Sequence, residues 1–374
     1  MTHTRVRKPL FLYGKDMMVR VLVDAREFAN MVAHAARVLE RDNPYVALDA
    51  MDDGLAVGAA GDSQWSHGRV DATVLEAGSA VVSGLWLNAL ANAMPSGEIS
   101  VEADGGYLTL RGGEASLRMR VGEEANRPAE PAAPERMVPV DADAYAALCG
   151  SIAPEAGGTR DQPVLASVRF VAADGLLTAT ATNRYMAGRR SIPVGGMPDG
   201  EWLADADWVK RNAKGVNMIG FTDRMMVVDT GGFTDAIVLT AGQYPMVDRL
   251  FAKPEEPAGV AVVDRRTLMD AARMLKSVCF DSRMGIIPLI LDERDGMLRV
   301  RYAGDGQDAD SQGVRLLEAG ITGDVNVKLN ADYLLTVLAG MDADRVSVVK
   351  TGEMKPVLFE QDDSAVEQLV MPVY

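Results

Sequence analysis

Residues 53–59 read Asp53-Gly54-Leu55-Ala56-Val57-Gly58-Ala59, residues 174–181 read Asp174-Gly175-Leu176-Leu177-Thr178-Ala179-Thr180-Ala181, and residues 295–302 read Asp295-Gly296-Met297-Leu298-Arg299-Val300-Arg301-Tyr302. Each stretch opens with Asp-Gly, a frequent hairpin turn, and continues as a strand of alternating character. The three glycines are 121 residues apart in both intervals (175 − 54 and 296 − 175). Equal spacing predicts one structural unit repeated three times.

An aspartate precedes an amphipathic stretch near the start of each unit. Val23-Asp24, Val140-Asp141 and Val263-Asp264 lead into apolar residues spaced three and four apart, which places them on one helix face. Each aspartate stands where a helix N-cap belongs. The apolar positions are Phe28, Met31, Val32, Ala35, Val38 and Leu39, then Tyr145, Leu148 and Ile152, then Leu268, Ala271, Ala272, Leu275 and Val278.

A second, shorter helix is expected in each unit. Ser83, Asp207 and Asn330 precede these helices, and Pro95 and Gly215 end the first two. Strands are expected after them, over residues 99–103, 107–111 and 116–121, then 225–229 and 236–240, then 346–350, 356–360 and 367–372. Each unit therefore reads helix, strands, helix, strands over about 120 residues, an α+β arrangement.

The chain length and two linkers suggest where the units divide. A chain of 374 residues is too long for one ordinary core. Residues 123–136 and 252–259 are rich in Pro, Ala and Glu and poor in core-forming side chains. We predict three domains, 1–136, 137–255 and 256–374, with residues 1–17 as an extension.

The composition is that of an acidic globular protein. The net charge is −15, which opposes tight, non-specific adhesion to nucleic acid. No uninterrupted apolar run is long enough to span a membrane, and no secretory signal is recognisable. Cys149 and Cys279 lie in apolar helical patterns, where buried thiols of a cytoplasmic protein are expected.

No catalytic or metal-binding pattern is present in the sequence. His3, His34 and His67 are scattered, and no phosphate-binding or dinucleotide-binding glycine motif occurs. Residues 308–313 imitate the start of a calcium loop, but Ala319 occupies the position of its bidentate glutamate. We therefore expect no cofactor, no metal and no enzymatic activity.

Three further segments carry a family resemblance. Residues 181–194, Ala-Thr-Asn-Arg-Tyr-Met-Ala-Gly-Arg-Arg-Ser-Ile-Pro-Val, residues 241–250, Ala-Gly-Gln-Tyr-Pro-Met-Val-Asp-Arg-Leu, and residues 369–373, Leu-Val-Met-Pro-Val, resemble motifs of the bacterial DNA polymerase III β-subunit sliding clamps. Their order and their places in the triple repeat strengthen the resemblance, which covers the chain from about Met18 onward. The chain departs from the family pattern at Asn183, Met186 and Ala187, where the family usually has Asp, Arg and Leu. A divergent bacterial clamp and a virus-encoded one both fit these departures.

The resemblance implies an architecture and a set of partners. Two subunits would join head to tail through strand pairing, and their six domains, each with two helices packed on antiparallel sheets, would form a ring around duplex DNA. The ring would act as a processivity factor that tethers a replicative DNA polymerase after a clamp loader has placed it on DNA. Topology holds the DNA in such a ring, so an acidic exterior is compatible with this function.

The resemblance also implies two sets of functional residues. The basic residues expected to face DNA from the helices are Arg26, Arg37, Lys210, Arg211, Lys214, Arg265, Arg266, Arg273 and Lys276. A hydrophobic cleft between the second and third domains would hold short partner peptides by a few apolar anchors. Its expected residues are Leu165, Thr182, Tyr185, Met186, Ala187, Pro245, Arg249, Leu250, Pro356, Leu369, Met371, Pro372 and Val373.

Two other functions remain open at this level. A clamp-like adaptor that does not encircle DNA would fit the weak positive charge of the expected inner helices. An enzyme on a repeated α+β scaffold would need a catalytic cluster that the sequence does not offer.

Overall fold

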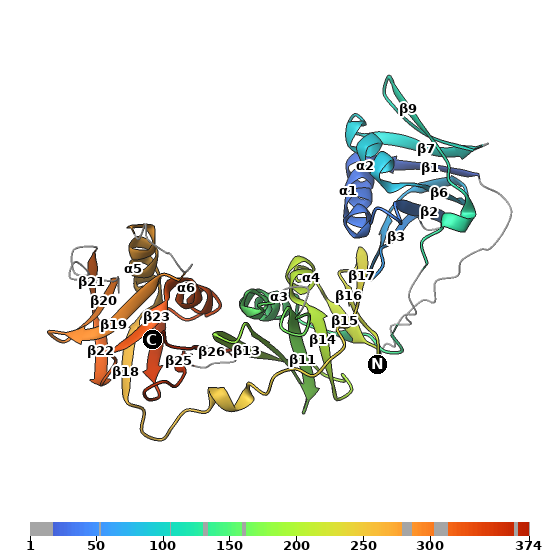
Figure 1. Ribbon diagram of the computed structural model, residues 1–374. Coiled ribbons are helices and arrows are strands. Elements are labelled where there is room, and N and C mark those ends of the chain that lie inside the picture. The colour runs from blue at the N-terminus through green and yellow to red at the C-terminus, as the bar shows by residue number, and fades with distance from the viewer. Residues whose placement is uncertain are drawn as a thin grey trace. The chain divides into compact units, whose positions relative to one another are not determined.

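The computed structural model describes residues 18–51, 54–104, 106–129, 134–158, 162–278, 286–302, 313–362 and 366–373 (Figure 1). The chain forms two compact units. The first consists of Met1–Ala133 with Gly231–Ala236, and the second consists of Pro134–Thr230 with Ile237–Tyr374. The predicted division into three domains, 1–136, 137–255 and 256–374, stays a prediction.

The first unit contains two antiparallel sheets and two helices. In the described residues, one sheet has the order β5 (Thr73–Glu76), β1 (Val19–Asp24), β7 (Glu98–Asp104), β8 (Tyr107–Gly112) and β9 (Ala115–Arg120). The other contains β4 (Gln64–Val70), β3 (Gly54–Ala60), β2 (Tyr45–Met51) and β6 (Gly78–Ser83) in that order. Helices α1 (Ala25–Ala35) and α2 (Gly84–Ala93) pack together, and their buried faces join one core with both sheets.

The second unit holds the second and third repeats, and one sheet runs through both. In the described residues its order is β14 (Gly200–Asp205), β11 (Ser167–Ala173), β12 (Leu176–Thr182), β13 (Met186–Pro193), β26 (Val366–Val370), β25 (Val357–Glu360), β24 (Arg345–Lys350), β18 (Gly259–Asp264) and β22 (Ala319–Gly323). The antiparallel pairing of β13 with β26 joins the two repeats. A continuous hydrogen-bonded ladder is the reason that they form one compact unit.

The remaining strands of the second unit cover the other sides of its cores. Strands β10 (Val138–Pro139), β15 (Met218–Phe221) and β16 (Met225–Asp229) are paired in this order. Strand β17 (Phe233–Val238) follows β16 along the chain, and its residues up to Ala236 belong to the first unit. Strands β21 (Val314–Leu317), β20 (Met297–Tyr302), β19 (Pro288–Arg294) and β23 (Val327–Asn330) form a further sheet. The helices are α3 (Ala142–Ile152), α4 (Ala206–Arg211), α5 (Arg265–Val278) and α6 (Ala331–Ala339).

The repeated Asp-Gly pairs form the expected hairpin turns in the second and third repeats. Asp174 and Gly175 have φ angles of 52° and 75°, and Asp295 and Gly296 have φ angles of 55° and 77°. Positive φ values at two successive residues are typical of the turn in a two-residue hairpin, because the twist of this turn matches the twist of the two strands that it joins. Asp53, in the first repeat, lies outside the described residues.

The three predicted aspartate caps are confirmed. Asp24 accepts hydrogen bonds from the backbone N–H groups of Arg26 and Glu27 at 2.9 and 3.1 Å, and Asp141 accepts one from Ala144 at 2.8 Å. Asp264 accepts from the N–H of Thr267 at 2.7 Å and from its hydroxyl at 2.6 Å. The hydrogen bond from the Thr267 hydroxyl has the largest effect on the pKa of Asp264, and with the backbone bond it holds this pKa below its usual value.

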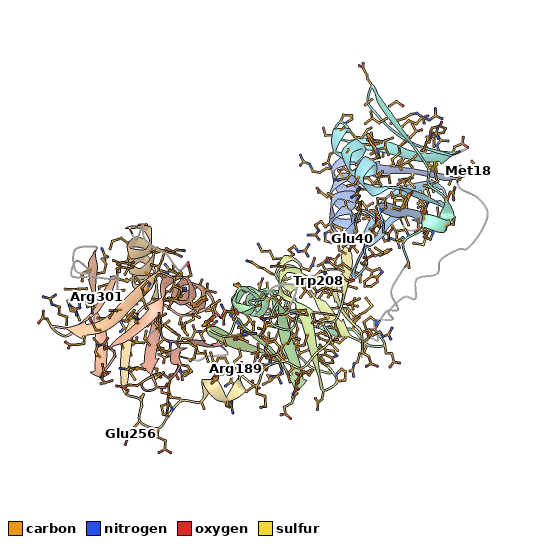
Figure 2. The ribbon with its side chains drawn as sticks, viewed as in Figure 1. Met18, Glu40, Arg189, Trp208, Glu256 and Arg301 are labelled. Atoms are coloured by element: carbon orange, nitrogen blue, oxygen red, sulfur yellow. The ribbon has the colours of Figure 1, made fainter. Side chains whose placement is uncertain are left out.

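The predicted start of the second helix in the second repeat is wrong by two residues. The helix begins at Ala206, and Asp205, not Asp207, accepts the N–H of Trp208 at 2.8 Å. The burial of Trp208 (Figure 2) explains the difference. Its side chain must point into the core, so Trp208 lies within the first turn of the helix, and the capping residue must precede that turn. The other second helices begin after Ser83 and Asn330, as predicted.

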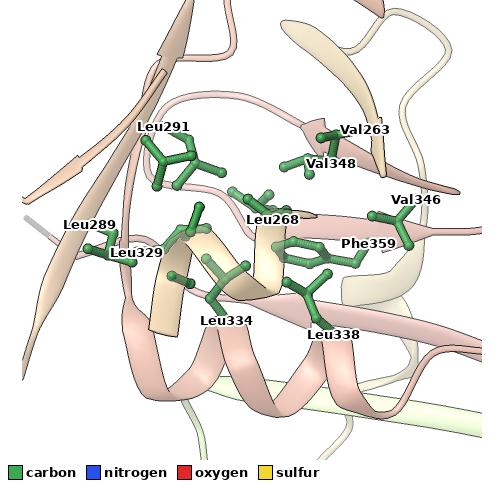
Figure 3. Close-up of a cluster of buried hydrophobic side chains, with 14 of the residues drawn as sticks. Val263, Leu268, Leu289, Leu291, Leu329, Leu334, Leu338, Val346, Val348 and Phe359 are labelled. Carbon is green, nitrogen blue, oxygen red and sulfur yellow. The ribbon is translucent and has the colours of Figure 1, made fainter. Parts of the chain in front are cut away.

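Apolar stripes on the helices build the cores. In the third repeat, Leu268 of α5 and Leu334 and Leu338 of α6 are fully buried against Leu291 and Phe359 of the sheets (Figure 3). Cys149 is also buried, as predicted, and burial raises the pKa of its thiol to about 12. Cys279 and the calcium-like segment 308–313 lie outside the described residues. Of the described helices, none has the length and apolar character that a membrane crossing requires.

Candidate peptide-binding surface

A tight turn between β12 and β13 presents an aromatic side chain. The Thr182 hydroxyl donates to the carbonyl oxygen of Met186 at 2.7 Å and accepts from the N–H of Arg184 at 3.0 Å. The Asn183 side-chain oxygen accepts from the N–H groups of Tyr185 and Met186 at 2.9 and 2.8 Å. The turn leaves the Tyr185 side chain 58% exposed. Asn183 supplies the same acceptor oxygen as the family's usual Asp, so this departure preserves the turn.

The C-terminal segment lies against this turn. Within the β13–β26 ladder, Met186 pairs with Val370 and Ala187 pairs with Leu369. Beyond the ladder, the N–H of Met371 donates to the carbonyl oxygen of Tyr185 at 2.7 Å. The N–H of Val373 donates to the carbonyl oxygen of Lys328, in β23, at 2.8 Å. The structure therefore brings two predicted segments, one from the second repeat and one from the third, together.

Tyr333, on α6, is a member of this surface that sequence reasoning missed. Its ring is stacked on Tyr185, with centroids 6.0 Å apart and planes 8° apart. Burial raises the pKa of the Tyr333 hydroxyl, and the nearby Tyr185 and Asp332 raise it further. A signal was available, because Tyr333 stands beside the apolar stripe of Leu334 and Leu338 and not within it.

The thirteen predicted cleft residues differ widely in exposure. Five of them, Leu165, Thr182, Met186, Ala187 and Leu369, are buried. Tyr185, Pro245 and Arg249 are exposed, and Leu250, Pro356, Met371, Pro372 and Val373 are half-buried. The exposed and half-buried members can meet a ligand directly, whereas the buried members shape the backbone beneath it.

The strand alternation sends neighbouring predicted residues to opposite faces. Met186 joins the core of the third repeat, together with Val357 and Val370. Ala187 points the other way and packs with Leu369 and Leu250. The Ala187 cluster is covered by the segment that follows β17, through its buried Tyr244, Val247 and Phe251. The small side chain at Ala187, where the family usually has Leu, reduces the volume that this cluster must accommodate.

Most of the predicted DNA-facing residues are solvent-exposed on helices or beside them. Arg26 lies in the first turn of α1, and Lys210 and Arg211 lie in the last turn of α4. The exposed members are Arg26, Arg37, Lys210, Arg211, Lys214, Arg266 and Arg273. Arg37 directs its Nη2 to the His34 ring at 2.6 Å. Helix α2, by contrast, carries no charged residue at all.

Several of the predicted cations on α5 are engaged within the subunit. The guanidinium of Arg265 donates to the carbonyl oxygens of Ala343 and Leu338 at 2.7 and 3.1 Å, so it satisfies the end of α6. Arg273 pairs with Asp270 at 3.3 Å, and Lys276 pairs with Asp332. Of the four predicted cations on α5, Arg266 has the weakest contact within the subunit, since its partner Asp344 is 3.9 Å away and exposed.

The described residues offer no metal centre. Among them, no three His, Cys, Asp or Glu side chains gather in a way that holds an ion. What the second unit offers instead is a surface of aromatic, methionine and proline side chains around Tyr185 and the C-terminal segment. Such a surface is suited to binding and not to proton transfer or nucleophilic chemistry.

Sequence comparison finds relatives over most of the chain. The Beta sliding clamp of Streptomyces coelicolor is 25% identical over 388 aligned positions, which cover 95% of this chain and 99% of that protein. The Beta sliding clamp of Micrococcus luteus is 29% identical over 254 positions, which cover 64% of this chain and 79% of that protein. No family model matches the chain.

Solved structures share the fold. The β subunit of DNA polymerase from Streptococcus pyogenes superposes with a TM-score of 0.85 at 14% identity, and the DNA polymerase sliding clamp of Bacillus subtilis with a TM-score of 0.82 at 17% identity. Each superposition covers 95% of this chain and 99% of the other. The resemblance expected from the sequence motifs is thus confirmed, and the chain is a divergent relative of the bacterial β sliding clamps.

Proposed function

We propose that this protein is a DNA sliding clamp, a processivity factor that encircles duplex DNA and tethers a replicative DNA polymerase. One observation carries the proposal. The similarity to the S. coelicolor clamp runs over 95% of this chain and 99% of that protein, so no domain of the relative is missing. The three-fold α+β repeat agrees with this function.

The proposed assembly is a head-to-tail dimer. In the described part of the first unit, β9 is at the end of its sheet, and in the described part of the second unit, β21 is at the end of another. Unpaired strand edges invite pairing with a second chain. Val314 and Leu316 on β21 are 36% and 45% exposed, and apolar side chains at an open edge favour an interface.

The proposed peptide site is the surface around Tyr185, Tyr333 and the segment Met371–Val373. Polymerase and clamp-loader subunits would place apolar anchors against it. Flexible methionine side chains adapt to several partners, and a stacked aromatic pair provides a rigid anchor point. The proposal includes Pro245, Arg249 and Leu250 as the neighbouring wall.

Topological retention on DNA tests the function directly. The protein is loaded onto a nicked circular plasmid by a purified bacterial clamp loader, and the complex is separated from free protein by gel filtration. A restriction enzyme then cuts the plasmid once. A clamp co-elutes with the circle and is lost after linearisation, because a ring slides off a free end.

Two results would contradict the proposal. Retention that is unchanged by cutting the plasmid would indicate ordinary DNA binding. Absence of retention, together with class averages in negative-stain images that contain only single three-lobed subunits at micromolar concentration, would favour an adaptor with the clamp fold that does not encircle DNA.

A further inference from the structure

A carboxyl group is completely buried where the second and third repeats meet. Glu155 ends the short 3-10 helix Ala153–Glu155 that follows α3, and its side chain is 0% exposed. No described Lys, Arg or His forms an ion pair with it within 4.0 Å. Burying an ionised carboxylate without a cation costs far more free energy than burying the neutral acid.

Gln368, on β26 of the third repeat, is the polar group that faces Glu155. It is 1% exposed. A Cβ atom added to Gly188, which pairs with Gln368 in the ladder, would lie 2.5 Å from both carboxyl oxygens of Glu155 and 2.5 Å from Oε1 of Gln368. The three oxygens therefore surround one point, and only glycine leaves room for them.

The other end of the Gln368 amide lies toward the end of α3 and forms no hydrogen bond there. A Cβ atom added to Gly340 would lie 2.7 Å from Nε2 of Gln368 and 2.9 Å from the carbonyl oxygen of Ser151. The donor end of the amide thus faces the carbonyl end of α3, and the acceptor end faces Glu155. The reversed amide would turn its oxygen toward the Ser151 carbonyl oxygen, placing two acceptors together.

The orientation of the Gln368 amide determines whether the ionised or the neutral form of Glu155 can form a hydrogen bond with it. Two acceptors, the carboxylate and Oε1 of Gln368, cannot form a hydrogen bond unless one of them carries a proton. A neutral carboxyl, by contrast, can donate its O–H to Oε1. We propose that Glu155 is a protonated acid whose hydrogen bond to Gln368 fastens the second repeat to the third, so that the junction weakens as the pH rises.

Two cations on β13 form ion pairs with carboxylates other than Glu155. Helix 153–155 contacts α3, α4, α6, β12 and β13. On β13, Arg189 (Figure 2) pairs with Glu367, and Arg190, on the same face as Gly188, pairs with Asp342 at 2.7 Å. The remaining titratable groups are Asp143, Tyr145 and Cys149 on α3, Asp207, Lys210 and Arg211 on α4, Asp332 and Tyr333 on α6, and Tyr244 in the covering segment. Strand β12 has none.

The direction of the pH effect follows from burial. Burial is the largest cause and raises the pKa of Glu155 well above its ordinary value of 4.5. Above pH 4.5 the unfolded chain releases the proton that the folded chain retains. Folding stability therefore falls with rising pH until the folded-state pKa is reached, and the junction is tightest in mild acid.

Hydrogen exchange of the β13–β26 ladder tests the proposal on the full-length protein. The backbone amides of Met186–Arg190 and Val366–Val370 are compared between the wild type and Glu155→Gln from pH 5 to pH 9, always at the same pH. Glutamine keeps the shape and donates to Oε1 without a titrating proton. We expect the protection of the wild type relative to E155Q to fall by up to about tenfold per pH unit.

A matched control removes the same charge elsewhere. Glu353→Gln, in the exposed turn after β24, should leave the ratio to the wild type independent of pH. A constant ratio for E155Q across the whole pH range would overturn the proposal. If E155Q does not fold, infrared spectra of wild-type protein with ¹³C-labelled glutamate decide, because a protonated-carboxyl band must persist at pH 7 and its absence refutes the proposal.

Discussion

Single polar side chains start the helices of this fold. Asp24, Asp141, Asp205 and Asp264 each accept the backbone N–H groups of a first helical turn. An N-cap works because a short side chain reaches donors that the helix itself leaves unsatisfied. The aspartate that stands directly before the first turn is the one that caps, even where a second aspartate lies nearby.

Helix α4 provides a test with an internal control. Asp205→Ala removes the observed cap and should destabilise the helix by about 1 kcal/mol. Asp207→Ala, at the exposed position first expected from the sequence, should change stability by less than about 0.5 kcal/mol. Hydrogen exchange of residues 208–211 measures both. Equal effects of the two substitutions would mean that the cap is not the relevant interaction.

A buried ion pair holds the segment that leaves the first unit. Both Asp49 carboxyl oxygens, on β2, accept from Nη1 of Arg127 at 3.1 Å. Burial raises the pKa of Asp49, and Arg127 lowers it only in part. The pair thus attaches residues 124–127 to the sheet, and Arg127 favours the charged form of Asp49.

Loss of Arg127 should therefore destabilise the first unit in a pH-dependent way. Arg127→Met leaves the Asp49 carboxylate buried without its cation, at a cost of about 3 kcal/mol near pH 7. The defect should shrink toward pH 4, since Asp49 then takes up a proton in the folded state that the unfolded chain would release above its usual pKa of 3.8. Urea denaturation at several pH values measures this. Asp49→Asn with Arg127→Met should show a smaller and pH-independent loss.

At the scale of elements, the β13–β26 ladder is central to the second unit. It joins two repeats, carries the buried Glu155–Gln368 contact on one side, and ends at the turn that presents Tyr185. A change in the ladder would reach the surface through the hydrogen bond between Met371 and Tyr185. The proposed peptide surface is therefore as rigid as the pairing beneath it.

The stacked tyrosines should contribute directly to peptide binding. Tyr185→Ala and Tyr333→Ala should each weaken binding of a fluorescent peptide copied from the clamp-binding segment of a bacterial replicative polymerase by about thirtyfold, the size of a typical interface hot spot. Fluorescence anisotropy measures the affinity. Met354→Ala removes a side chain that is 71% exposed, in a different turn, and should have no effect. Unchanged affinity in both tyrosine variants would remove this surface from the proposed site.

At the scale of the whole molecule, edges and charge govern assembly. A net charge of −15 favours solubility and opposes non-specific DNA binding, so the proposed function requires encirclement and not adhesion. The exposed apolar side chains Val314 and Leu316 lie on β21, which is an edge strand of its sheet in the described residues. They are suited to continue the sheet into a second subunit.

Charged substitutions on this edge should separate the subunits. Val314→Lys with Leu316→Lys places two ammonium groups where strands would pair, and the double variant should have the mass of a single chain in light scattering. Leu176→Lys alters a similarly exposed residue on β12, which is paired on both sides, and should leave the dimer intact. A dimer that survives the double substitution would exclude β21 as the contact.

Local patterns in the sequence were sufficient to predict the repeated fold. The Asp-Gly turns of the second and third repeats and the caps Asp24, Asp141 and Asp264 are short-range features that the structure confirms, whereas the start expected at Asp207 is wrong. Hairpin turns and caps depend on a few neighbouring residues, so the sequence alone determines them.

The tertiary structure decided what depends on packing between distant segments. Strand alternation placed Met186 and Ala187 on opposite faces of one sheet, and the end of α6 engaged Arg265, which the sequence had assigned to the DNA-facing set. Tyr333 met Tyr185, and Glu155 met Gln368, only because β13 and β26 pair. Residues 148 or more positions apart become neighbours through the ladder, and no local pattern records such a contact.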